Sequence, residues 1–178
     1  MPQQNKRFCL DTNCLIEAKN RYYAFDILPR FWELILECCD DGIILIPESV
    51  YEELKEGYRD EELLEWARQH KQTLFTPLDP EMFQIVGSIS NFVMQNFKQE
   101  KANIFLKGRD PEIISFAKHK NLMLVTQEGR VNLDNSKDKD GKFNARIKIP
   151  NICEFFDVEY VNLFDMLRIL KRDYGKGL

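Results

Sequence analysis

The sequence predicts an α/β protein in which helices cover both faces of a mostly parallel sheet. Short apolar runs at 7–10, 43–46 and 122–125 alternate with segments whose apolar residues recur at helical spacing. The run at 43–46 (IILI) is continuous, as in strands that are covered on both faces. This alternation is typical of a three-layer α/β/α arrangement. The length of 178 residues favours one domain, 1–178, around a single core.

The first part of the chain contains recognisable helix starts and ends. The first strand ends at Asp11, and a helical region follows whose clearest part begins at Pro29 and ends at Gly42. Another helix is expected from Pro47 to near Gly57.

The middle of the chain continues the alternation. A helix through 63–67 precedes a brief strand at 74–76, and a longer helix is expected at 80–98. Residues 99–109 look like a loop with basic character, and Asp-Pro-Glu at 110–112 opens the next helix.

The last part of the chain begins with a polar stretch, 129–146, which contains NLDNSKDKDGK. This composition predicts a mobile insertion. A strand near 158–161 and a helix through 163–170 close the chain.

The composition disfavours several classes of protein. No stretch approaches the roughly 18 to 20 apolar residues of a membrane span, and MPQQNKRF contains no signal-peptide core, so a cytoplasmic protein is expected. The five cysteines lack CxxC spacing and are expected to be reduced thiols. With His70 and His119 as the only histidines, a zinc site or a serine-type triad is poorly supplied.

The charge is unevenly distributed. A net charge of −4 argues mildly against a generic nucleic-acid binder. Acidic residues crowd 48–65, whereas basic residues gather at 98–109 and 137–148. This segregation can steer a polyanion to one side of the molecule, and the alternative is that both runs are solvated faces.

Two acids lie at the carboxyl ends of predicted strands. Asp11 follows the first strand directly, and Glu128 follows the strand at 122–125 in Thr-Gln-Glu. Ligands of α/β folds bind at this edge of the sheet. The alternative for Asp11 is that it, or Thr12, caps the next helix. Asn13 could orient a carboxylate or a water, or could be a turn residue.

Two further acids lie on predicted helices. Val50 and Leu54 define the buried face of their helix, which places Glu53 on its flank and points Glu52 away. Glu53 is therefore favoured over Glu52. Asp110 opens a helix, and on its own it would be interpreted as a capping residue.

Several carboxylates in one crevice require a cation, because they raise one another's pKa. Oxygen ligands select Mg²⁺ or Mn²⁺ over zinc or copper. Such ions can activate water and polarise a phosphoryl oxygen, so no side-chain nucleophile is needed.

Four segments together resemble a PIN domain, the metal-dependent ribonuclease fold of VapC-type toxins. These are CLDTNCLI, IPESVYEEL, GRDPEIISFAK and LMLVTQE, in that order, and they cover most of the chain to about residue 128. The tail, IPNICEFF and VEYVNLFDMLRIL, resembles one bacterial PIN-like branch.

The resemblance implies a sheet of about five strands, one or two Mg²⁺ or Mn²⁺ ions, and cleavage of RNA. The family's four acids map to Asp11, Glu53, Asp110 and Glu128, and its polar positions to Asn13 and Thr126. Glu128 departs from the more usual Asp. Family members commonly dimerise, and toxins pair with an antitoxin protein.

The leading hypothesis is an endoribonuclease, the toxin of a toxin–antitoxin pair, with phosphate contacts from Lys107, Arg109 and Arg130. The alternative is a catalytically silent module that binds RNA or a protein. A third hypothesis, a nucleotide phosphohydrolase with Asp11 as the nucleophile, is weakened by Asn13, which stands where a second Asp would be expected.

Overall fold

Five parallel strands form the centre of the computed structural model, which describes residues 5–57 and 60–178. The strands are β1 (Phe8–Leu10), β2 (Ile44–Pro47), β3 (Phe75–Thr76), β4 (Met123–Val125) and β5 (Tyr160–Val161). They lie in the order β3-β2-β1-β4-β5. The predicted α/β class with a parallel sheet is confirmed.

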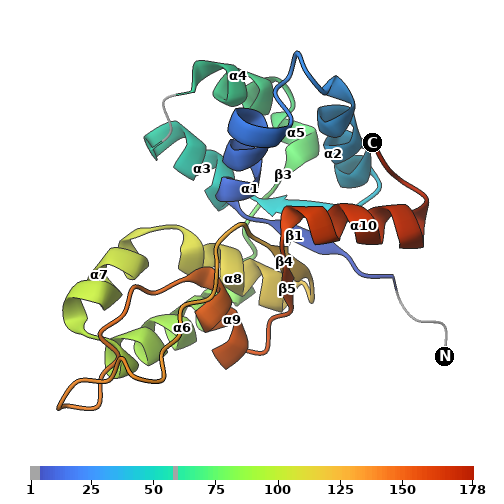
Figure 1. Ribbon diagram of the computed structural model, residues 1–178. Coiled ribbons are helices and arrows are strands. Elements are labelled where there is room, and N and C mark those ends of the chain that lie inside the picture. Colours follow the sequence, from blue (N-terminus) through green and yellow to red (C-terminus); the bar gives the residue numbers. More distant parts are fainter. Residues whose placement is uncertain (1–4, 58–59) are drawn as a thin grey trace.

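Two layers of helices enclose the sheet, and Figure 1 shows it nearly edge-on between them. The upper layer contains α1 (Thr12–Glu17), the π-helix η1 (Ala18–Tyr22), α2 (Pro29–Asp40), α3 (Glu48–Gly57), α4 (Glu61–Gln69), α5 (Lys71–Leu74) and α10 (Leu163–Tyr174). The lower layer contains the 3-10 helix η2 (Pro80–Met82), α6 (Phe83–Asn96), α7 (Gln99–Lys107), α8 (Asp110–His119) and α9 (Ile149–Phe155). The three-layer prediction is therefore also confirmed.

The central strand, β1, is the most deeply buried part of the sheet. All three of its residues are inaccessible to solvent, because helices cover both faces and β2 and β4 flank both edges. The buried hydrophobic residues of the described chain form one core cluster around it. The register pairs Leu10 with Val125, so the residues that follow β1 and β4 emerge side by side.

The prediction of a basic loop at 99–109 is wrong, because most of this segment is the helix α7. Ala102 and Phe105 lie one turn apart and face the core, whereas Ile104 is exposed. The exposed apolar side chain and the lysines obscured the helical period. The helix expected to open at Pro47 begins one residue later, since Pro47 is the last residue of β2.

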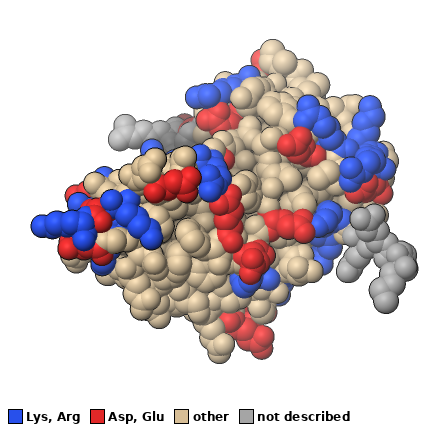
Figure 2. Space-filling model, turned by 60° about the horizontal axis from the view of Figure 1, so that its bottom comes forward, with Lys and Arg blue, Asp and Glu red and all other residues tan. Residues whose placement is uncertain are grey.

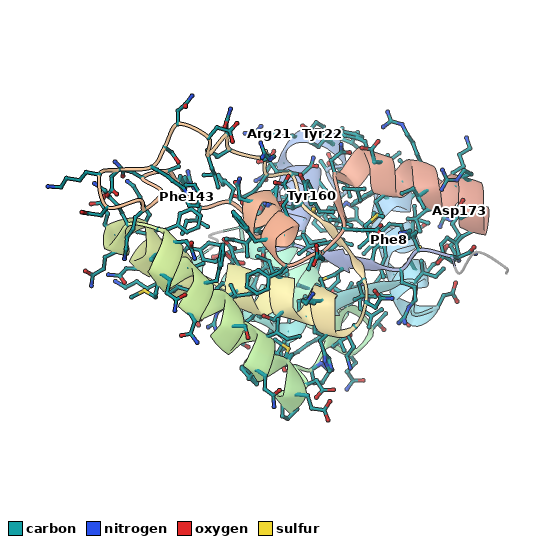
Figure 3. All side chains as sticks on the ribbon, turned by 90° about the horizontal axis from the view of Figure 1, so that it is seen from below. Phe8, Arg21, Tyr22, Phe143, Tyr160 and Asp173 are labelled. Atoms are coloured by element: carbon teal, nitrogen blue, oxygen red, sulfur yellow. The ribbon has the colours of Figure 1, made fainter. Side chains whose placement is uncertain are left out.

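The segment 129–146 extends from the lower layer and forms the orange loop in Figure 1. Phe143 connects it to the end of α6: its amide donates to the Asn96 carbonyl at 2.8 Å, and its carbonyl accepts from the Lys98 amide at 3.0 Å. Figure 3 shows the Phe143 ring lying between the segment and α6. The mobility of 129–146 stays a prediction.

Within residues 5–57 and 60–178, no helix combines the length and the apolar character that a membrane crossing requires.

Candidate metal centre at the carboxyl ends of β1 and β4

The site lies where the direction of chain progression changes in the sheet. From β1 the chain proceeds through β2 to β3 on one side, and then returns to β4 and β5 on the other side. The crevice beyond β1 and β4 is therefore the topological switch point, where open α/β sheets bind ligands. Asp11 follows β1 at this point, and Thr126 follows β4.

Asp11 is a buried carboxylate, only 3% exposed to solvent. It occupies the position before α1, but its side chain makes no helix-capping hydrogen bond. Its Oδ2 instead accepts from Thr126 Oγ1 at 2.9 Å. Burial raises the pKa of Asp11 well above its usual value, and nearby Asp110, Glu53 and Glu128 raise it further, while the Thr126 bond opposes them.

The Thr126 hydroxyl is fixed by a short relay of hydrogen bonds. Its Oγ1 accepts from Asn13 Nδ2 at 3.2 Å and from the Glu128 amide at 3.2 Å. Its own proton then points to Asp11. Asn13 Oδ1 in turn accepts from the Gln127 amide at 2.9 Å, which ties the start of α1 to the residues after β4. Asn13 and Thr126 therefore orient the Asp11 carboxylate.

On α3, Glu53 rather than Glu52 faces the site. Val50 and Leu54 are buried, as the predicted helix face requires. Glu53 Oε2 accepts from the hydroxyl of Thr12, and its charge raises the pKa of both Asp11 and Asp110. Glu52 Oε2 instead accepts from Lys55 Nζ at 2.7 Å.

Asp110 opens α8 without capping it. Arg109 occupies the capping position, and no side chain caps this helix. Burial raises the pKa of Asp110 to about 7, with contributions from the charges of Glu128 and Glu53. The nearby cations Lys148 and Arg146 pull the same pKa down.

Glu128 lies beside Asp110, but its own oxygens already have partners. Oε1 forms an ion pair with Lys148, and Oε2 accepts from the Ile149 amide at 3.0 Å. Glu128 therefore joins the residues after β4 to the start of α9.

Asp11, Glu53 and Asp110 form no ion pair with any residue that the structure describes. Unpaired carboxylates at a buried site favour a bound cation, because their mutual repulsion and desolvation are otherwise uncompensated. The oxygen-only donors suit Mg²⁺ or Mn²⁺. The residues present therefore fit such an ion, with Asp11, Glu53 and Asp110 as the side chains that would hold it.

The ligand atoms of Asp11, Glu53 and Asp110 do not form a closed cluster in the described chain. In the described chain, the group of three whose ligand atoms all lie within 4.8 Å of one another is Asp79, Glu81 and His119. Mg²⁺ commonly keeps several waters and uses only one or two carboxylates together with substrate phosphates, so an open arrangement suits it. The Asp79 group lies at the far end of α8 from Asp110 and also binds Lys120 Nζ at 3.3 Å.

Three cysteines lie beneath the site. Burial raises the pKa of the Cys9 and Cys14 thiols well above the usual value, and raises that of Cys153 to about 12. The negative charge of Asp11 adds to the shift in all three. They therefore remain protonated near neutral pH.

Of the three cations expected to contact phosphate, two have acidic partners. Arg109 binds Glu56 at 2.8 Å, and Arg130 Nε binds Glu154 at 2.9 Å. Lys107 is exposed at the end of α7 and forms no ion pair with the part of the chain that the structure describes. Arg109 and Glu56 also connect the basic run at 98–109 with the acidic run at 48–65.

Sequence reasoning missed the site roles of Thr12, Arg146 and Lys148. Thr12 was considered only as an alternative cap, although it binds Glu53. Arg146 and Lys148 belong to a basic run that was visible in the sequence. No local signal places that run next to Asp110, because the contact depends on how the segment 129–146 returns to the sheet.

The fold and the site together define an α/β protein with an acidic centre at the switch point of a parallel sheet. Residues 8–174 match the family described as "Domain of unknown function (DUF4411)". The chain belongs to this family. No curated protein matches the sequence.

Proposed function

We propose that this protein is a Mg²⁺- or Mn²⁺-dependent endoribonuclease of the PIN type. The observation that carries the proposal is Asp11, a buried carboxylate at the switch point whose partner is a hydroxyl rather than a cation. Glu53 and Asp110 approach it from α3 and α8, on opposite faces of the sheet. Such a convergence of acids suits phosphodiester hydrolysis better than a structural role.

The side chains of this chain would divide the work. Asp11, Glu53 and Asp110 would hold the ion, which would supply a lowered pKa for a bound water and offset charge on the phosphoryl group. Thr126 and Asn13 keep Asp11 oriented, and Thr12 does the same for Glu53.

The same proposal includes three finer assignments, which are a role as a VapC-type toxin, an antitoxin protein as the partner, and a homodimer. They rest on the ordered motifs around Asp11, Glu53, Asp110 and Glu128.

The test is cleavage of a mixed pool of single-stranded and structured RNA in the presence of Mn²⁺. Cutting by the wild type that disappears with EDTA and in Asp11→Asn is the expected result. Circular dichroism and thermal unfolding of Asp11→Asn show that the fold is intact. Full activity of a folded Asp11→Asn protein would exclude the assignment.

A binding module is the second candidate, and the surface of α6 favours it. This 14-residue helix contains no charged side chain, and Phe83 and Met94 on it are exposed. Figure 2 shows a broad uncharged surface, with the charges of the segment 129–146 at its left end. Calorimetric titration with Mn²⁺ separates the candidates, since absence of binding at millimolar Mn²⁺ would favour the module.

A further inference from the structure

We infer that Lys148 and Arg146 form a site for a backbone phosphate of single-stranded RNA beside the carboxylates. In this arrangement Glu128 is a positioning residue that holds Lys148, rather than a ligand of the ion. The inference rests on the proposed function for its substrate class, but its geometry is independent of the ion.

The first observation is that both oxygens of Glu128 already have partners. Its two oxygens bind Lys148 Nζ and the Ile149 amide, and both side chains of the ion pair are less than one-fifth exposed, 18% for Glu128 and 19% for Lys148. A metal ion would have to compete with Lys148 for this carboxylate, next to an ammonium group that repels it. Breaking such a pair leaves an uncompensated charge and is costly.

The second observation is the placement of the two cations. Lys148 forms an ion pair with Glu128, and Arg146 precedes it by two residues in the chain. In agreement with this placement, the charges of both lower the pKa of Asp110. Arg146 is exposed and forms no ion pair with the described residues, so its guanidinium is available to a ligand. Arg109 and Arg130, in contrast to Arg146, are already paired. Lys148 is paired with Glu128, but its ammonium group has three donors and that bond uses one of them.

The chemistry of the pair indicates an anion with several oxygens. An ammonium group and a guanidinium group next to an acidic centre would repel a second metal ion, but they match the oxygens of a phosphodiester. A nucleic-acid backbone supplies phosphates at regular intervals, so one phosphate could lie at the carboxylates while its neighbour contacts the cations. Glu128 fixes Lys148 at the edge of the crevice for this contact.

Binding of a fluorescently labelled single-stranded RNA in EDTA tests the site without cleavage. Lys148→Gln is expected to weaken binding roughly tenfold. The slope of the logarithm of the binding constant against the logarithm of the salt concentration should become shallower by about 0.7, the value for one phosphate contact on a single strand. Lys148→Arg should retain most of the affinity. The matched control is Lys139→Gln, which removes the same charge from an exposed position of the segment 129–146.

Glu128→Gln distinguishes positioning from simple charge. If Glu128 only repels the RNA, removal of its negative charge should tighten RNA binding. If Glu128 holds Lys148 in place, loss of that contact should weaken RNA binding. We expect weaker RNA binding, with Mn²⁺ affinity by calorimetry within about threefold of the wild type, which corresponds to less than about 0.7 kcal/mol. Thermal unfolding of each variant controls for loss of structure.

Four results would overturn the inference. They are equal RNA binding by wild type and Lys148→Gln, no RNA binding by either, tighter binding by Glu128→Gln, or loss of Mn²⁺ affinity in Glu128→Gln as large as in Asp11→Asn. The proposed function fails separately, when Asp11→Asn retains Mn²⁺ binding and cleavage. Either can fail while the other stands.

Discussion

The Thr126 hydroxyl donates a 2.9 Å hydrogen bond to Asp11 Oδ2 and so joins the residues that follow two adjacent parallel strands. The same oxygen accepts two other hydrogen bonds, which leaves its proton for Asp11 alone. The carboxylate at the centre of the sheet is therefore oriented by a group on the neighbouring strand, in advance of any ligand.

Thr126→Val should weaken Mn²⁺ binding while the fold is retained. Valine has nearly the same shape as threonine but cannot donate, and a hydrogen bond to a charged group contributes about 1.5–3 kcal/mol. We expect Mn²⁺ affinity by calorimetry to fall about tenfold to one hundredfold. Thr126→Ser, which keeps the hydroxyl, is the control, and an equal loss in both variants would contradict the role of this bond.

Glu53→Gln and Glu52→Gln form a matched pair on α3. Glu53 binds Thr12 and acts on Asp11 and Asp110, whereas Glu52 binds Lys55. Cleavage of RNA should fall at least about a hundredfold in Glu53→Gln, the loss of roughly 2.7 kcal/mol of transition-state stabilisation. Glu52→Gln should remain within about twofold of wild type, and comparable rates for both variants would contradict the assignment.

The stability of the EDTA-treated protein should fall as the pH rises from about 4 to about 7. The pKa of Asp110 is about 7 in the folded protein, against about 3.9 in an unfolded chain. Between these values the folded state holds a proton that the unfolded state has released, so the free energy of unfolding decreases with pH.

Urea unfolding at several pH values in EDTA measures this effect. Asp110→Asn should reduce the slope and stabilise the protein at pH of about 8 by on the order of 1 kcal/mol or more. The control Glu112→Gln alters an acid of the same helical turn that pairs with Arg109. A slope that is unchanged in Asp110→Asn would show that this carboxyl does not titrate as described.

Phe105→Ala and Ile104→Ala compare the two faces of α7. Phe105 is 4% exposed and Ile104 is 70% exposed. Truncation of a buried phenylalanine costs about 3–5 kcal/mol, whereas an exposed position should change the free energy of unfolding by less than about 0.5 kcal/mol. Equal effects in urea unfolding would mean that α7 does not pack as the structure shows.

The sheet could be predicted because its signal is local. Three of the five strands are short, mostly buried apolar runs, and a polar residue follows each of them. Asp11 and Thr126 could therefore be placed at the same edge before their contact was known. The helix α7 could not be predicted, because its buried face consists of little more than Ala102 and Phe105.

The partners of Glu128 were beyond sequence reasoning for a different reason. Lys148 lies 20 residues further along the chain, beyond a polar segment with no periodic pattern. Nothing local distinguishes Lys148 from the other lysines that precede it. Only the path of the chain back to α9 selects it, and this path is set by tertiary contacts such as that of Phe143 with α6.

The bond between Glu128 and the Ile149 amide closes the segment 129–146 at its base. This bond and the bonds of Phe143 to the end of α6 hold the segment at two places. The exposed turn at 139–141 lies beyond both, so it can change in length and composition without displacing Thr126 or Lys148.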